Sequence, residues 1–113
     1  MSPWEIRFSE SAAAEGWQEL SRLAPADTRW AWLTIRRNPA PLATSAYHHR
    51  LHDQLATGMV QGGVLDYWQL RVTEPALPGA VRGGGSPRWI RYLVDPEAHT
   101  VWIEYAGPGR NLA

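Results

Sequence analysis

The sequence contains no cysteine and no lysine. Without cysteine there is no disulfide framework, no thiolate zinc site and no cysteine nucleophile. Without lysine, all eleven positive charges are arginines, and eleven carboxylates balance them to a net charge of zero. A neutral protein does not coat nucleic acid by bulk electrostatics. The planar guanidinium nevertheless suits phosphate contacts, so a few clustered arginines can form a local basic patch.

Long apolar runs are also missing. No stretch approaches the roughly 18 apolar residues of a membrane span. The opening residues, MSPWEIRFSE, carry charges where a secretory signal has an apolar core. We therefore expect a soluble cytoplasmic protein that does not contact a membrane. A chain of 113 residues can bury one core, which predicts a single domain over residues 1–113.

The start of the chain predicts a strand and then a helix. Residues 4–8 alternate between apolar and charged side chains, which is typical of a half-buried strand. Ser9 and Ser11 are both suitable N-caps for a helix that Pro25 would close. The apolar positions of this helix follow at helical spacing: Ala13, Trp17, Leu20 and Leu23.

A second helix is predicted over residues 28–37, with Asp27 as its N-cap. Its inner stripe would be Trp30, Leu33 and Arg37, and it should end before Asn38-Pro39. The two helices would form an αα-hairpin. Residues 40–57 indicate either a helical turn or an irregular approach to a sheet.

The second half predicts three strands. Residues 64–72 read as the first, and the stretch SPRWIRYLVDPEAHTVWIEYAG supplies two more around a turn at residues 95–99. Residues 73–87, with three prolines and four glycines, predict a long flexible loop. The expected fold is α+β in the order β-α-α-β-β-β, a small antiparallel sheet with the two-helix hairpin packed on one face.

Four stretches occur in an order typical of one family: RLHDQL, DYWQLRV, RWIRYLVD and VWIEYAGPGR. Over nearly the whole chain, the sequence resembles the RelE/ParE toxin superfamily of type II toxin–antitoxin systems, with the RelE-like branch favoured. That resemblance implies a toxin that enters the ribosome, cuts mRNA there and is neutralised by a cognate antitoxin. The implied partners are the antitoxin, the ribosome and mRNA.

In such toxins a ribose 2′-hydroxyl attacks the neighbouring phosphate and leaves a 2′,3′-cyclic phosphate, without a metal ion or cofactor. The developing negative charge needs cations. The resemblance implies a catalytic set of Arg71, Arg91 and Arg110. It implies RNA-binding roles for Arg50, Gln69, Arg88 and Trp89. The strand register, which the sequence leaves open, decides between Arg88 and Arg91.

Several alternatives remain at this stage. The terminal residues PGRNLA lack the Tyr or His that many active relatives carry there, which favours a ParE-like inhibitor of DNA gyrase or a degenerate member that only binds its antitoxin. Arg91 could instead pair across the sheet with Glu104. The tryptophans at positions 68, 89 and 102 could stack on bases or fill the core. The spacing of His48 and His52 does not complete a metal site.

Overall fold

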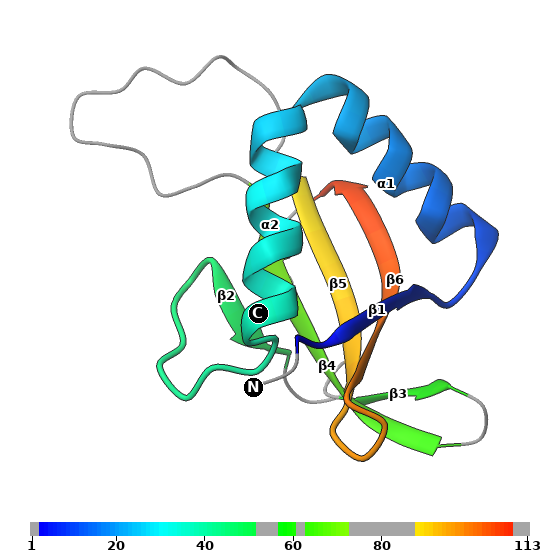
Figure 1. Cartoon of the computed structure of the whole chain (residues 1–113), viewed down its shortest axis with the longest axis vertical. Helices are drawn as coiled ribbons and strands as arrows, with labels where there is room; N and C mark the ends of the chain where they lie inside the picture. The colour runs from blue at the N-terminus through cyan, green and yellow to red at the C-terminus, as the bar shows by residue number, and fades with distance from the viewer. Residues whose placement is uncertain (1–2, 52–56, 61–62, 73–87, 110–113) are drawn as a thin grey trace.

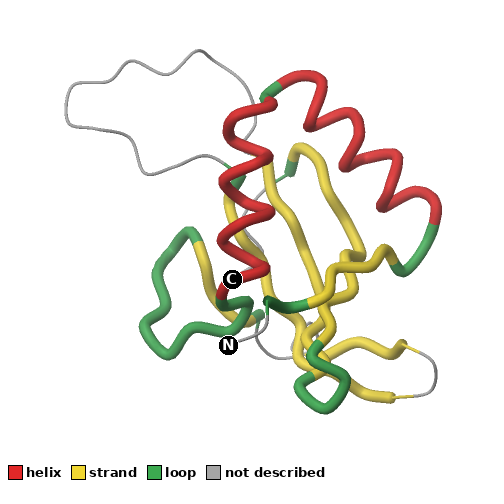
Figure 2. Tube along the Cα trace, viewed as in Figure 1, coloured by secondary structure: helices red, strands yellow, loops and turns green. Residues whose placement is uncertain are grey.

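The computed structural model describes residues 3–51, 57–60, 63–72 and 88–109 (Figures 1 and 2). The loop predicted over residues 73–87 and the predicted catalytic Arg110 lie outside the described residues.

The elements follow the predicted order, with two short strands added before the final three. The helices are α1 (Ser11–Leu23) and α2 (Pro25–Arg37). The strands are β1 (Glu5–Phe8), β2 (His48–Arg50), β3 (Thr57–Val60), β4 (Gly63–Arg71), β5 (Arg88–Asp95) and β6 (Thr100–Pro108). The α+β class and the two-helix layer are therefore confirmed. Neither β2 nor β3 was predicted, because their sequences show no alternation.

The sheet order is β1-β6-β5-β4-β2, and β3 also pairs with β4. The last three strands form the expected antiparallel meander. The sheet is mixed rather than antiparallel throughout, because β1 at one edge runs parallel to β6. The residues that pair, such as Phe8 with Ile103, lie too far apart in the sequence for a local pattern to reveal their direction.

Both helices lie on the same side of the sheet (Figure 1), and α1 packs mainly against β6. Ala13 and Leu20 of α1 are buried, whereas Leu23 is 51% exposed. On α2 the predicted inner stripe is confirmed at Trp30, which packs against the core, and wrong at Leu33, which is 43% exposed, and at the exposed Arg37. The buried positions are Thr28, Ala31 and Ile35. The amphipathic stripe is thus rotated from the one that the aromatic side chains suggested.

The helix starts also differ from the prediction. Neither Ser9 nor Ser11 caps α1, since Glu10 is the N-cap residue. Ser9 instead follows β1, and its hydroxyl lies 2.9 Å from the Glu104 carboxylate. Pro25 begins α2 rather than closing α1. A proline suits the first turn of a helix because no intrahelical acceptor exists there for an amide proton.

Candidate functional site

The two faces of the sheet carry different side chains. Towards the helices, the central strands present the apolar residues Trp68, Leu70, Ile90, Tyr92, Val101 and Ile103. Because side chains alternate along a strand, the intervening residues project from the opposite face. We call that opposite face the arginine face. Its members are Tyr47, His49, Tyr67, Gln69, Arg71, Trp89, Arg91, Trp102, Glu104 and Tyr105.

Two predicted catalytic residues, Arg71 and Arg91, meet on the arginine face. The register pairs Arg71 with Trp89 and Arg91 with Gln69, which makes the two arginines diagonal neighbours on β4 and β5. Diagonal neighbours in an antiparallel pair are roughly 7–8 Å apart. This spacing is that of the backbone positions, and both side chains project from the same face, Arg71 towards Tyr47 and Arg91 towards Tyr105.

The Arg71 side chain is held by an aromatic ring and not by an acid. Its guanidinium carbon lies 5.3 Å from the centroid of the Tyr47 ring. Its backbone amide donates to the Tyr47 carbonyl at 2.7 Å, which fixes the two residues relative to each other. Within the described ranges no carboxylate pairs with Arg71, and its buried Nε has no hydrogen-bond partner. A buried donor without an acceptor is costly, so this group is suited to an anionic ligand.

A β-bulge shapes the surroundings of Arg91. The register shifts between Arg91 and Tyr92, so that Arg91 faces Tyr105 while Glu104 occupies the bulge. The Arg91 guanidinium carbon lies 4.9 Å from the centroid of the Tyr105 ring. The Tyr105 hydroxyl donates to the Pro108 carbonyl, which fixes the ring. The sequence prediction of Glu104 opposite Arg91 missed this extra residue, and bulges are frequent beside functional sites.

The charges of Arg91 and Glu104 both affect the pKa of Tyr67. Burial raises the pKa of the Tyr67 phenol above its ordinary value, the negative charge of Glu104 raises it further, and the positive charge of Arg91 opposes the rise. Tyr67 therefore keeps its proton at neutral pH and can donate it. Glu104 accepts from the Ser9 hydroxyl at 2.9 Å. An acid and a carboxylate thus accompany the arginines.

Gln69 and His49 are the buried polar members of the arginine face and form its floor. Gln69 is fully buried and His49 is 8% exposed. The Gln69 amide nitrogen donates to His49 Nε2 at 2.9 Å. The neutral ring then carries its proton on Nδ1, which donates to the Ser45 carbonyl at 2.9 Å. Gln69, predicted to bind RNA, lies in this floor, where it orients His49.

The tryptophans divide between the two faces. Trp68 belongs to the core beneath the helices. Trp89, predicted to bind RNA, lies on the arginine face but is only 3% exposed, and its indole donates to the Gly109 carbonyl at 3.1 Å. The Trp89 ring, which was expected to stack on bases, is therefore packed inside the protein. Trp102 is half-buried on the same face, with the Arg7 guanidinium carbon 5.9 Å from its centroid.

The remaining predicted site residues do not join this group. Arg88 alternates with Trp89 and so projects to the helix side, where it lines a hollow with Leu20 and Leu23. Arg50 forms an ion pair with Asp66 at 3.0 Å at the edge of the sheet. The sequence analysis missed Tyr47, Tyr67, Glu104 and Tyr105. The alternation within DYWQLRV could have indicated Tyr67. The positions of Glu104 and Tyr105 depend on the bulge, which no sequence pattern reveals.

The described part of the chain contains no group of three or more His, Cys, Asp or Glu residues arranged to hold a metal ion. His48 turns away from the arginine face, and its Nε2 lies 2.5 Å from the Tyr92 hydroxyl. His52 lies outside the described residues. In the same described part, neither helix combines the length and apolar character needed to cross a membrane.

Comparison of the chain with protein-family models, curated proteins and solved structures found no significant match.

Proposed function

We propose that this protein is a toxin of a type II toxin–antitoxin system that cuts mRNA on the ribosome, with the arginine face as its RNA-binding site. The observation that carries the proposal is the state of Arg71. Its guanidinium is stacked on Tyr47 without a carboxylate partner in the described structure, and its buried Nε lacks an acceptor. A phosphate oxygen would supply that acceptor.

The arrangement of the face supports a specific chemistry. Arg71 and Arg91 would hold the scissile phosphate and stabilise the negative charge that develops on its oxygens. Glu104 would take the proton from the ribose 2′-hydroxyl as its oxygen bonds to phosphorus. The bond from phosphorus to the 5′-oxygen would break, and Tyr67 would give that oxygen a proton. The products are a 2′,3′-cyclic phosphate and a free 5′-hydroxyl.

The roles of the two tyrosines beside the arginines are positional. Tyr47 and Tyr105 each present a ring to one guanidinium, which restricts its rotamers without neutralising its charge. An arginine held in this way loses less conformational entropy when it binds phosphate. A cognate antitoxin would inhibit such a toxin by covering this face or by supplying carboxylates to the two arginines.

Inducible expression in bacterial cells tests the proposal, with primer extension on abundant mRNAs. The wild-type protein should arrest growth and produce new cuts within translated codons, and the Arg71→Ala/Arg91→Ala variant should do neither. Arg22→Ala is the matched control, because Arg22 lies exposed on α1 and forms an ion pair with Glu19. Arrest without cuts would overturn the nuclease assignment and point to a non-enzymatic target such as DNA gyrase. Absence of arrest would overturn the toxin assignment.

A further inference from the structure

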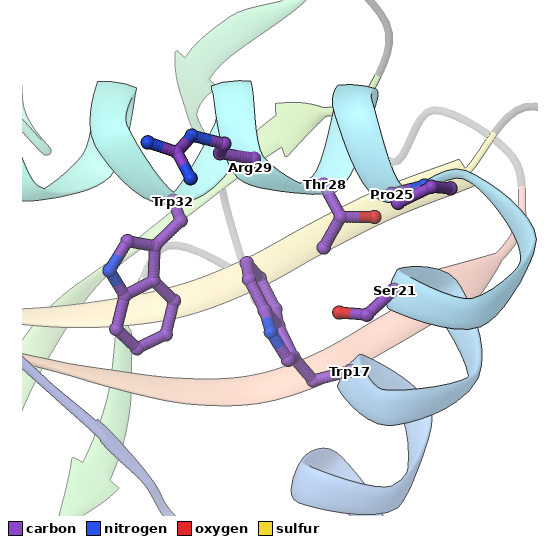
Figure 3. Close-up of a pocket in the computed structure, with 6 residues that line it drawn as sticks. All are labelled: Trp17, Ser21, Pro25, Thr28, Arg29 and Trp32. Atoms are coloured by element: carbon purple, nitrogen blue, oxygen red, sulfur yellow. The ribbon is translucent and has the colours of Figure 1, made fainter.

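A second candidate site lies in the helical layer, with the sheet between it and the arginine face. A cavity of about 270 Å³ opens between α1 and α2. Among the described residues, its lining comes from the two helices: Trp17, Ser21, Pro25, Thr28, Arg29 and Trp32 (Figure 3). None of these residues was predicted to belong to the RNA site, and none has a role in the proposed RNA cleavage.

The cavity has an aromatic wall. The rings of Trp17 and Trp32 meet edge to face with centroids 5.1 Å apart, and Figure 3 shows both indoles in the space between the two helices. The ring of Phe8 packs against that of Trp17, with centroids 6.2 Å apart. Both tryptophans remain partly exposed. Partly exposed tryptophans in a concavity are typical of the anchor points of protein interfaces.

The size of the cavity limits what it can hold. Pockets for small molecules and cofactors are roughly 300–1,000 Å³, and this cavity is smaller. It therefore fits a single large apolar side chain better than a nucleotide. Side chains that anchor a peptide in a helical groove are inserted in this way.

The positive charges near the cavity indicate that the partner is negatively charged. Arg29 lines the cavity, and Arg36 follows two turns later on the same stripe of α2 as Arg29 and Trp32. Across the described residues, neither Arg29 nor Arg36 pairs with a carboxylate. By contrast Arg22, on α1, is neutralised by Glu19 at 2.5 Å. The guanidinium group of Arg29 at an apolar hollow, with that of Arg36 further along the same stripe of the helix, complements carboxylates that flank an apolar residue.

We propose that this cavity docks an acidic segment of a partner protein, with one large apolar side chain inserted against Trp17 and Trp32 and flanking carboxylates on Arg29 and Arg36. The site and the arginine face belong to opposite sides of the sheet. A partner bound here leaves the arginine face uncovered, so peptide and RNA would bind at the same time. The inference does not depend on whether the arginine face cleaves RNA.

The probe is a short fluorescein-labelled peptide of glutamate and alanine with one central leucine, titrated into the full chain and followed by fluorescence anisotropy. Arg29→Ala and Trp32→Phe should each weaken binding about tenfold or more. Arg37→Ala is the matched control, because Arg37 is exposed on the same helix outside the cavity, and it should change the affinity less than about twofold. Replacing the leucine of the peptide by serine should abolish binding.

The indole proton resonances of Trp17 and Trp32, assigned by single Trp→Phe variants, locate the peptide independently of affinity. They should shift on titration while that of Trp102, on the arginine face, stays constant. The proposal is overturned if the peptide does not bind, if the serine peptide binds equally well, or if Trp102 shifts instead. It is also overturned if single-stranded RNA shifts Trp17 and Trp32, or if sedimentation shows that a second copy of the chain occupies the cavity.

Discussion

Individual side chains in this protein are positioned by partners that differ in chemistry from one arginine to the next. Arg50 and Arg22 form exposed ion pairs with carboxylates, which contribute little to stability. Arg71 lies against an aromatic ring and has no carboxylate partner within the described residues, and Arg91 also lies against a ring. A ring orients a guanidinium but leaves its charge available to a ligand. Arginines that look equivalent in the sequence therefore differ in the fold in whether they can bind an anionic ligand.

The planar shape of the Arg71 guanidinium is expected to matter as well as its charge. Arg71→Lys keeps the charge but loses the fork geometry and the stacking on Tyr47, so we expect the affinity for a single-stranded RNA oligonucleotide to fall about tenfold. Fluorescence anisotropy with a labelled oligonucleotide measures the change, and Arg22→Lys serves as the control. Unchanged affinity of Arg71→Lys would mean that Arg71 does not contact the phosphate through two hydrogen bonds.

His48 links the stability of the fold to pH. The pKa of His48 is lowered to about 4, chiefly by burial; the hydrogen bond to the Pro39 carbonyl opposes this shift, and the neighbouring His49 adds to it. The unfolded chain binds a proton below pH 6.5, whereas the folded protein resists it until about pH 4. Stability is therefore full above pH 6.5 and is lost as the pH falls from 6.5 to 4.

We expect the wild-type protein to lose about 2 kcal/mol of unfolding free energy through His48 between pH 7 and pH 5. Urea unfolding at both pH values measures the loss, and His48→Gln should lack this part of it. His99→Asn is the control, because His99 has a φ of 51° that asparagine tolerates. An identical pH dependence in His48→Gln and wild type would contradict the assignment.

At the scale of the elements, one glycine fixes how closely α1 approaches β6. A β-carbon on Gly16 would lie 2.2 Å from the backbone oxygen of Ala106. Alanine normally stabilises a helix interior by about 1 kcal/mol relative to glycine. Here the helix would have to move away from the sheet, and overpacking of this kind typically costs about 1–3 kcal/mol.

Gly16→Ala should therefore destabilise the protein by about 1–2 kcal/mol, against the helix propensity of the residue. Ala12→Gly, at an exposed position of the same helix, should lose about 1 kcal/mol by propensity alone. Urea unfolding of the two variants beside wild type measures both effects. A Gly16→Ala protein more stable than wild type would show that α1 does not pack on β6 this closely.

At the scale of the whole molecule, neutrality limits how the protein can attract nucleic acid. With a net charge of zero, long-range electrostatics do not concentrate RNA at the surface. Binding should therefore depend on the few phosphate contacts made by the arginine face. We expect a shallow dependence of RNA affinity on salt, in contrast to that of strongly basic proteins.

The Arg71→Ala/Arg91→Ala variant should reduce the slope of log affinity against log salt by about 1.4, the value for two contacts to a single strand. Anisotropy titrations over a range of salt concentrations measure the slope. If the variant and the wild type share one slope, the two arginines do not contact phosphates. The Arg22→Ala protein should retain the wild-type slope, because Arg22 is paired on the surface of α1.

Much of the architecture could be predicted from the sequence because it depends on local patterns. Alternation over residues 4–8 and the apolar spacing of the first helix are visible without a structure, and the turn at residues 95–99 lies where β5 ends and β6 begins. The helix boundaries were less predictable. Pro25 suits the end of one helix as well as the start of the next, and in the structure it occupies the first turn of α2.

The tertiary structure alone decided the features that define the candidate site. The parallel pairing of β1 with β6 joins residues from opposite ends of the chain. The bulge beside Arg91 adds Glu104 and Tyr105 to one face, and the register sends Arg88 to the other. These outcomes follow from contacts between strands, and a shift of one residue in register moves every side chain of a strand to the opposite face. The sequence by itself thus determined which residue types and elements are present, whereas packing determined which of the arginines meet.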